Sequence, residues 1–155
     1  MDNLSNFIKK NNFFNYFDIV HSSYAFYYSK KQNTLLKEVK KSLKKNGLIL
    51  ISAPAEPHEM VNFIDKISPI SKKIINTLKF MEKKLIPFIK KNCSKKIFIK
   101  KINYINFNNS EEFIDFWSNT TYFKKSKQNK VLELLNKRKK LKFKKISAIA
   151  AGLIK

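Results

Sequence analysis

The sequence of 155 residues contains two histidines, and each one follows an apolar segment with the pattern of a β-strand. His21 comes directly after the segment at 16–20, and His58 comes six residues after the segment at 48–52. An imidazole titrates near neutral pH and can accept or donate a proton, so both histidines are candidate catalytic acids or bases. The alternative interpretation is that His21 is a satisfied loop residue and His58 a solvated one.

Hydroxyl groups and aromatic rings follow His21 in the sequence. Ser22 and Ser23 can hydrogen-bond a ligand, or they can simply turn the chain. A wall of tyrosines could stack on a planar group, although aromatic residues at this density also fill protein cores. The candidate wall residues for substrate are Tyr24, Tyr27 and Tyr28.

A second polar group lies in the loop after the segment at 48–52. Glu56 is a further candidate for substrate contact, and it stands near His58 and Glu59 in the sequence. Three such side chains can bind a metal, but no further histidine or cysteine ligand is nearby. We therefore predict no metal site.

The segments at 16–20 and 48–52 are predicted to be parallel strands joined by a helix at about 33–45. The helix has apolar residues on one face, and Gly47 stands where a left-handed residue would end it. The segment "LILIS" is apolar at nearly every position, as in a strand covered on both faces. Ligands of open α/β sheets bind beyond the carboxyl ends of such strands, so both histidines are predicted to face one cleft.

The rest of the chain predicts further helices and two more strands. Apolar spacing indicates helices at about 60–67, 74–89 and 122–138, with a proline, Pro87, that should kink or end the second. Another helix should begin with Ser110 as its N-cap. The alternating segment at 96–107 and the final segment at 142–154 are predicted to be antiparallel strands. We expect a single α/β domain over residues 1–155.

The composition limits the classes of function and the compartment. The chain has 33 basic and 11 acidic residues and a net charge of +22, which would favour non-specific binding to polyanions. Arg138 is the single arginine, whereas nucleic-acid readers favour arginine, and the amino-acid usage is that of A/T-rich codons. One cysteine and no long apolar run favour a cytoplasmic protein without a membrane segment.

Several stretches together resemble class I S-adenosylmethionine-dependent methyltransferases. They are "FDIVHSSYAFYY", "LKKNGLILISAP" and "FNNSEEFIDFWSNTTYF", with the two closing strands at the sheet edge. The resemblance implies a Rossmann-like methyltransferase sheet. It also implies that His21, Ser22 and Ser23 lie beside the cofactor and that the loop after Ser52 helps to form the substrate pocket. The stretch "HSSY" replaces the Asn/Asp-Pro-Pro-aromatic motif of nucleic-acid amino methylases, so the expected substrate is a small molecule.

The family's glycine-rich cofactor loop has no counterpart in this sequence, whose two glycines are Gly47 and Gly152. A βαβ unit takes roughly 30 residues, and only 15 precede Tyr16. We therefore expect the C-terminal half of the fold, truncated or split. S-adenosylmethionine would bind if the missing N-terminal half were supplied. The expected partners are a small-molecule substrate and either that N-terminal half or further copies of the chain in a homo-oligomer. The alternatives are a basic RNA-binding or other nucleic-acid-binding module and an inactive remnant.

Overall fold

The computed structural model describes residues 4–155, whose contacts divide them into two compact units. Unit 1 comprises residues up to Glu56, Thr77–Lys101 and Ser147–Lys155, and unit 2 comprises Pro57–Asn76 and Ile102–Ile146. Strands β3 (Cys93–Phe107) and β4 (Leu141–Ile154) contribute residues to both units. The expectation of one domain over 1–155 stays a prediction.

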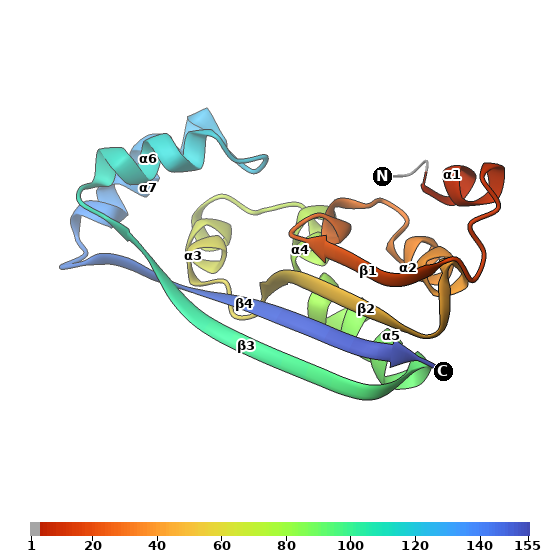
Figure 1. Ribbon diagram of the computed structural model, residues 1–155. Coiled ribbons are helices and arrows are strands. Elements are labelled where there is room, and N and C mark those ends of the chain that lie inside the picture. Colours follow the sequence, from red (N-terminus) through yellow and green to blue (C-terminus); the bar gives the residue numbers. More distant parts are fainter. Residues whose placement is uncertain (1–3) are drawn as a thin grey trace. The chain divides into compact units, whose positions relative to one another are not determined.

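Unit 1 holds the parallel part of the sheet and the helices that cover it (Figure 1). Its strands are β1 (Phe17–Ser23) and β2 (Leu43–Ala55), with parts of β3 and β4. Its helical elements are α1 (Leu4–Lys10), η1 (Phe26–Tyr28), α2 (Gln32–Ser42), η2 (Met81–Leu85) and α5 (Ile86–Asn92).

The strand order is β1-β2-β4-β3. Strand β1 pairs with β2 in parallel, and the other pairings are antiparallel, which confirms the predicted fold class. The register places Ile19 opposite Leu48 and Ser23 opposite Ser52. Both strands are longer than the sequence predicted. Strand β1 continues three residues beyond Val20, and β2 extends beyond the predicted segment at both ends. His21 therefore lies within the strand and not after it.

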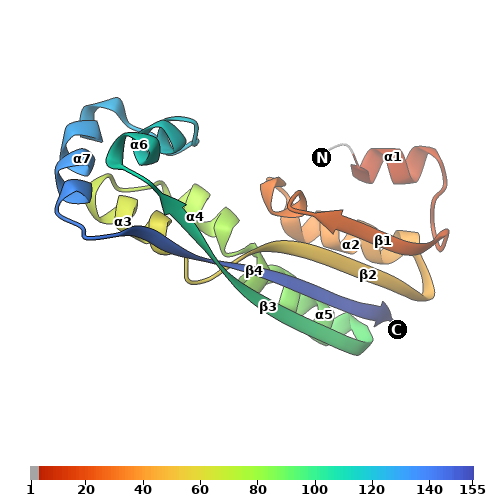
Figure 2. The same ribbon diagram turned by 60° about the vertical axis from the view of Figure 1, so that its left-hand side comes forward.

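One face of the sheet in unit 1 is covered by α2 and α5 (Figure 2). Val39 of α2 and Ile89 of α5 are fully buried, as are Ile49 and Ile51 of β2. Helix α2 forms because its apolar residues recur at helical spacing, which gives it one apolar face to bury. This packing fixes which side chains of β1 and β2 point into the core.

The structure corrects one local expectation, the end of α2, and excludes one of the two alternatives for Pro87, the end of its helix. Helix α2 ends at Ser42, and the left-handed residue is Asn46, with φ 63°, while Gly47 lies within β2. Asparagine tolerates this conformation because its short polar side chain can bond to the local backbone. Pro87 does not end its helix: a π-helical turn, η2, precedes α5, and the helix continues to Asn92. Such a turn redirects the hydrogen bonds at the point where proline supplies no donor.

Unit 2 contains α3 (Glu59–Ile67), α6 (Ser110–Ser118), η3 (Lys125–Lys127) and α7 (Gln128–Asn136). Helix α4 (Lys72–Leu78) begins in unit 2 and ends in unit 1. Four phenylalanine rings form the core of unit 2, with centroids 5.0–6.1 Å apart in the contacting pairs. These rings are Phe63, Phe107, Phe113 and Phe143.

The helix boundaries of unit 2 differ from the sequence predictions in two places. The N-cap of α6 is Asn109 and not Ser110, because the side chain of Asn109 accepts a hydrogen bond from the backbone N–H of Glu112 at 2.8 Å. The carboxylate of Glu112 in turn accepts from the backbone N–H of Asn108, the residue before the N-cap, at 2.7 Å, which adds a second bond at this end of the helix. Helix α7 begins at Gln128, several residues later than predicted, after the turn η3.

None of the helices in the described part of the chain combines the length and apolar character that a membrane span requires.

Candidate functional site at the carboxyl end of β1

The register of β1 and β2 places His21, Ser23 and Ser52 on one face of the sheet. His21 is opposite Leu50, and Ser23 is opposite Ser52. The hydroxyl of Ser52 donates to that of Ser23 at 3.1 Å, so the two side chains meet on the same side. His21 and Ser23 are exposed. Side chains alternate between faces along a strand, so these residues lie opposite the face that α2 and α5 cover.

Ser22 points to the other face, into the core of unit 1. It is 7% exposed, and its hydroxyl has no hydrogen-bond partner in the described part of the chain. Ser22 and Ser23 therefore differ in access, although they are neighbours in the sequence. The structure separates Ser22 from the exposed pair His21 and Ser23.

Tyr24 closes the strand with a left-handed backbone, φ 52°. Its N–H donates to the carbonyl of Ser52 at 2.9 Å, and its hydroxyl donates to the hydroxyl of Ser147 on β4. These bonds connect the end of β1 with its neighbouring strand and with β4. Tyr24 is half-buried, so part of its ring faces the edge of the candidate site.

The residues of the predicted aromatic wall differ in exposure, since Tyr24 is half-buried, Tyr27 is buried and Tyr28 is exposed. Phe26 and Tyr27 are buried residues of η1, whereas Tyr28, its last residue, is 65% exposed. The rings of Tyr27 and Tyr28 are 4.2 Å apart between centroids. Burial and the neighbouring Tyr28 raise the pKa of Tyr27 above its ordinary value. Of these three residues, Tyr28 presents the most ring surface to a ligand.

Glu56 and His58 belong to different units. Glu56 belongs to unit 1, where it forms an ion pair with Lys79 at 2.9 Å. His58 belongs to unit 2, where it is half-buried before α3 and its carbonyl accepts from the N–H of Asn62 at 2.9 Å. The predicted cleft shared by His21 and His58 stays a prediction. In the described residues no three His, Cys, Asp or Glu side chains gather as a metal site would require.

The two glycines of the sequence lie in strands and not in a loop. A glycine-rich loop lets backbone amides approach a nucleotide-like ligand closely. Gly47 and Gly152 instead lie within β2 and β4. A Cβ atom on Gly152 would meet Cys93 at 2.7 Å, so this glycine serves core packing. What the carboxyl end of β1 offers is a hydroxyl pair, an imidazole and a tyrosine.

Sequence analysis missed a groove in unit 1 that is lined by eight lysines. Three lysines of the run "KKSLKK" line this groove, namely Lys40, Lys41 and Lys45. The helical spacing of Lys37, Lys40 and Lys41 could have indicated a basic face of α2. The partner lysines on η2 and α5 are distant in the sequence, so only the fold brings the set together.

Comparison with known proteins supports the resemblance. Residues 11–51 match the family model for a methyltransferase domain, and this segment includes all of β1 and α2 and most of β2. No curated protein sequence matches the chain.

Solved structures with the same fold include a methyltransferase candidate from Bacillus halodurans, which is 13% identical with a TM-score of 0.54. The alignment covers 90% of this chain and 70% of that one. They also include the YcgJ protein of Bacillus subtilis, which is 15% identical with a TM-score of 0.57 and coverages of 92% and 65%. The MccD protein is 9% identical with a TM-score of 0.51 and coverages of 92% and 62%. The chain thus spans about two thirds of the length of these structures. Its similarity to class I S-adenosylmethionine-dependent methyltransferases is confirmed by the domain match and by the shared α/β fold.

Proposed function

We propose that the chain forms part of an S-adenosylmethionine-dependent methyltransferase that acts on a small molecule. The observation that carries the proposal is the position of the methyltransferase-domain match, residues 11–51. This segment forms the βαβ unit whose carboxyl end exposes His21 and Ser23. Ligands of open α/β sheets bind at that end of the strands.

The exposed groups suit ligand positioning. His21 can hold or accept a proton, and the hydroxyls of Ser23 and Ser52 can hydrogen-bond a polar ligand. Methyl transfer depends mainly on the alignment of the acceptor with the methyl donor. These residues would therefore contribute by binding and orienting the ligand at the strand ends. The small-molecule assignment follows from "HSSY", which lacks the proline-aromatic motif associated with nucleobase amines.

A second polypeptide segment is proposed to supply the glycine-rich loop. Two features of the chain support this. Its two glycines are both inside strands, and β1 is the terminal strand of the described sheet order, so one edge of β1 is available for pairing. Ile19 of β1 is also 59% exposed, which leaves apolar surface beside that edge.

Titration calorimetry with S-adenosylmethionine tests the proposal. The chain alone should give no heat of binding. Heat should appear after addition of a polypeptide translated from the adjacent upstream DNA, if that DNA encodes a strand followed by a glycine-rich loop. In the reconstituted sample, Ser23→Ala should weaken binding, while Ser22→Ala is the matched control because its hydroxyl faces the core.

The possible outcomes separate the two parts of the proposal. Binding by the chain alone would refute the need for a second segment while supporting the methyltransferase assignment. A complex that forms but binds no cofactor would refute the assignment and favour an inactive remnant.

A further inference from the structure

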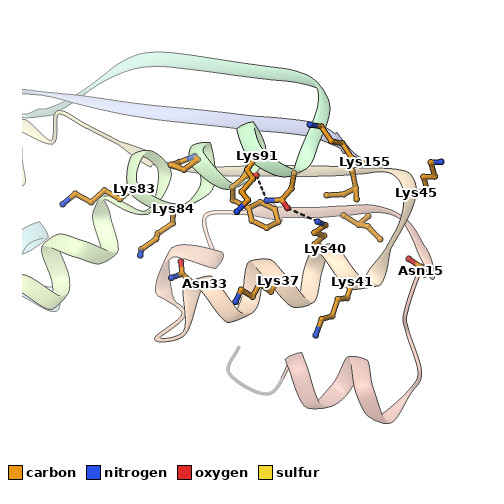
Figure 3. Close-up of a pocket in the computed structure, with 15 residues that line it drawn as sticks. Asn15, Asn33, Lys37, Lys40, Lys41, Lys45, Lys83, Lys84, Lys91 and Lys155 are labelled. Atoms are coloured by element: carbon orange, nitrogen blue, oxygen red, sulfur yellow. Dashed lines mark hydrogen bonds between the residues drawn. The ribbon is translucent and has the colours of Figure 1, made fainter.

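A concave, strongly basic surface lies on the helical side of unit 1 (Figure 3). We call it the lysine groove. It has a volume of about 920 Å³ and lies between α2 on one side and η2 and α5 on the other, with the beginning of β2 and the end of β4 at one extremity. Its lysines are Lys37, Lys40, Lys41, Lys45, Lys83, Lys84, Lys91 and Lys155.

The charge of the lysine groove is largely unbalanced. No aspartate or glutamate is among the described residues that line it. Lys41 has an ion pair, with Glu38 at 3.2 Å, and in the described part of the chain no ion pair involves the other seven lysines. Like charges around a concave wall raise the local positive potential, because the low-dielectric protein focuses the field into the opening. An anion in the groove would relieve that repulsion.

One lysine of the groove is held in place by a hydrogen bond. Lys40 of α2 donates to the side-chain oxygen of Asn92 at 2.9 Å, which joins the two walls, and the amide of Asn92 donates to the carbonyl of Phe88 at 2.8 Å. Figure 3 shows Lys37 on α2 and Lys84 on the opposite wall. The groove is therefore a built surface with cations on both walls.

The lining distinguishes between classes of anion. Single-stranded nucleic acids are bound by aromatic rings on which bases stack, and Phe88 is the one ring among the lining residues described. Arginine, the residue that reads bases with two parallel hydrogen bonds, is also missing from this lining. Lysines act as mobile point charges that suit phosphate groups. The volume is within the range of small-molecule sites, which is roughly 300–1,000 Å³.

From these features we propose that the lysine groove is a binding site for a small oligophosphate, a ligand with several consecutive phosphate groups. The site is separate from the proposed methyltransferase site, because it lies among α2, η2 and α5, whereas His21 and Ser23 are exposed on the opposite face of the sheet. Successive phosphates would lie between the lysines of the two walls. Affinity should therefore rise with the number of phosphates, from inorganic phosphate to pyrophosphate to tripolyphosphate.

Calorimetry with tripolyphosphate at about 0.15 M salt, where the screening length is about 8 Å, tests this site. The groove variant is Lys37→Gln/Lys84→Gln/Lys91→Gln. The control variant is Lys90→Gln/Lys96→Gln/Lys101→Gln, which removes the same charge from unit 1 at exposed positions outside the groove. The groove variant should lose at least about tenfold in affinity, a difference of about 1.4 kcal/mol, while the control should stay within about twofold of the unsubstituted chain.

Folding of each variant is checked by the protection of the buried thiol of Cys93, in unit 1, against a thiol reagent. A groove variant that keeps the thiol protected and loses the ligand supports the site. Equal losses in both variants would overturn it, because the cause would then be the net charge of the chain. Undetectable binding of tripolyphosphate by the unsubstituted chain would also overturn it. Tighter, groove-dependent binding of a 12-nucleotide single-stranded RNA would refute the small-ligand assignment in favour of nucleic acid.

Discussion

Replacement of Gly152 by alanine should destabilise unit 1, for a reason that can be worked out from distances. Gly152 is buried in β4, and its φ is not positive, so the backbone there permits any residue. A Cβ atom at this position would stand 2.7 Å from the Cβ of Cys93 and 3.2 Å from the Cγ2 of Ile89. Carbon atoms in contact prefer about 3.5–4.0 Å, so the strands or the helix α5 must move apart by close to 1 Å.

The size and the sign of the effect are both informative. Glycine-to-alanine changes at unstrained positions usually stabilise a protein by about 0.4–1 kcal/mol, because the unfolded chain loses freedom. Overpacking of a filled core costs about 1–3 kcal/mol. Both Cys93 and Ile89 are fully buried and have little room to yield, so the steric cost should exceed the entropic gain. A net loss of one to two kcal/mol raises the unfolded fraction about 5- to 30-fold.

The single cysteine provides the assay. Cys93 is buried, and burial raises the pKa of its thiol, so both access and thiolate formation are suppressed in the folded unit. The rate of labelling by a thiol reagent follows the population of the open form when opening is fast relative to the reaction. Gly152→Ala should therefore accelerate labelling about 5- to 30-fold at a fixed urea concentration below the transition.

Ile149→Val provides the control for this experiment. Ile149 is in the same strand and is 39% exposed, so its truncation should change stability by less than about 0.5 kcal/mol. Labelling of Gly152→Ala at or below the rate of the unsubstituted chain would refute the close approach of β4 to Cys93. Acceleration by both variants to the same extent would show that β4 is generally frayed.

Three further predictions concern other parts of the chain. Asn109→Ala should destabilise unit 2 by about 1 kcal/mol, because the N-cap of α6 is lost. Urea unfolding followed by the fluorescence of the single tryptophan, Trp117, measures this loss, and Asn109→Asp should retain most of the stability. Ser22→Ala should leave the stability of unit 1, measured by the labelling of Cys93, unchanged or raised, because the buried hydroxyl of Ser22 has no hydrogen-bond partner in the described chain. A loss of more than about 1 kcal/mol in the free energy of unfolding would contradict the absence of a partner. The hydrogen bond and charge of Lys137 lower the pKa of Glu133, so Lys137→Gln should raise that pKa toward 4.5 in an NMR titration. The pair's contribution to stability should be present above about pH 4.5 and disappear as the pH falls through the pKa of the folded state, and identical titrations would contradict the pairing.

The sequence predicted the sheet well because local patterns dominate there. The two parallel strands and the two closing strands were located to within a few residues, since buried strands require apolar or alternating runs. The helix between β1 and β2 was also identified by its apolar face. The boundaries of the helices were predicted less accurately, because they depend on single cap and turn residues such as Asn46 and Asn109. A neighbouring residue, Gly47 or Ser110, is of a type that could have served equally well.

The candidate site was predicted only in part. His21 and Ser23 are exposed at the expected end of β1, whereas Ser22 faces the core and Phe26 and Tyr27 are buried. Position along the chain indicates which residues are near a strand end. The face on which each side chain lies depends on the register with β2 and on how far β1 extends, and neither is visible in the sequence.

By itself, the sequence determined the α/β class, the parallel strand pair and the resemblance to methyltransferases, because these depend on periodicity and on short motifs. Tertiary structure decided two other matters. It divided neighbouring serines between two faces of the sheet, and it brought lysines from α2, η2 and α5 around one groove. The reason is that the lysines of η2 and α5 are distant in the sequence from those of α2, so their assembly follows from the packing of the apolar faces beneath them.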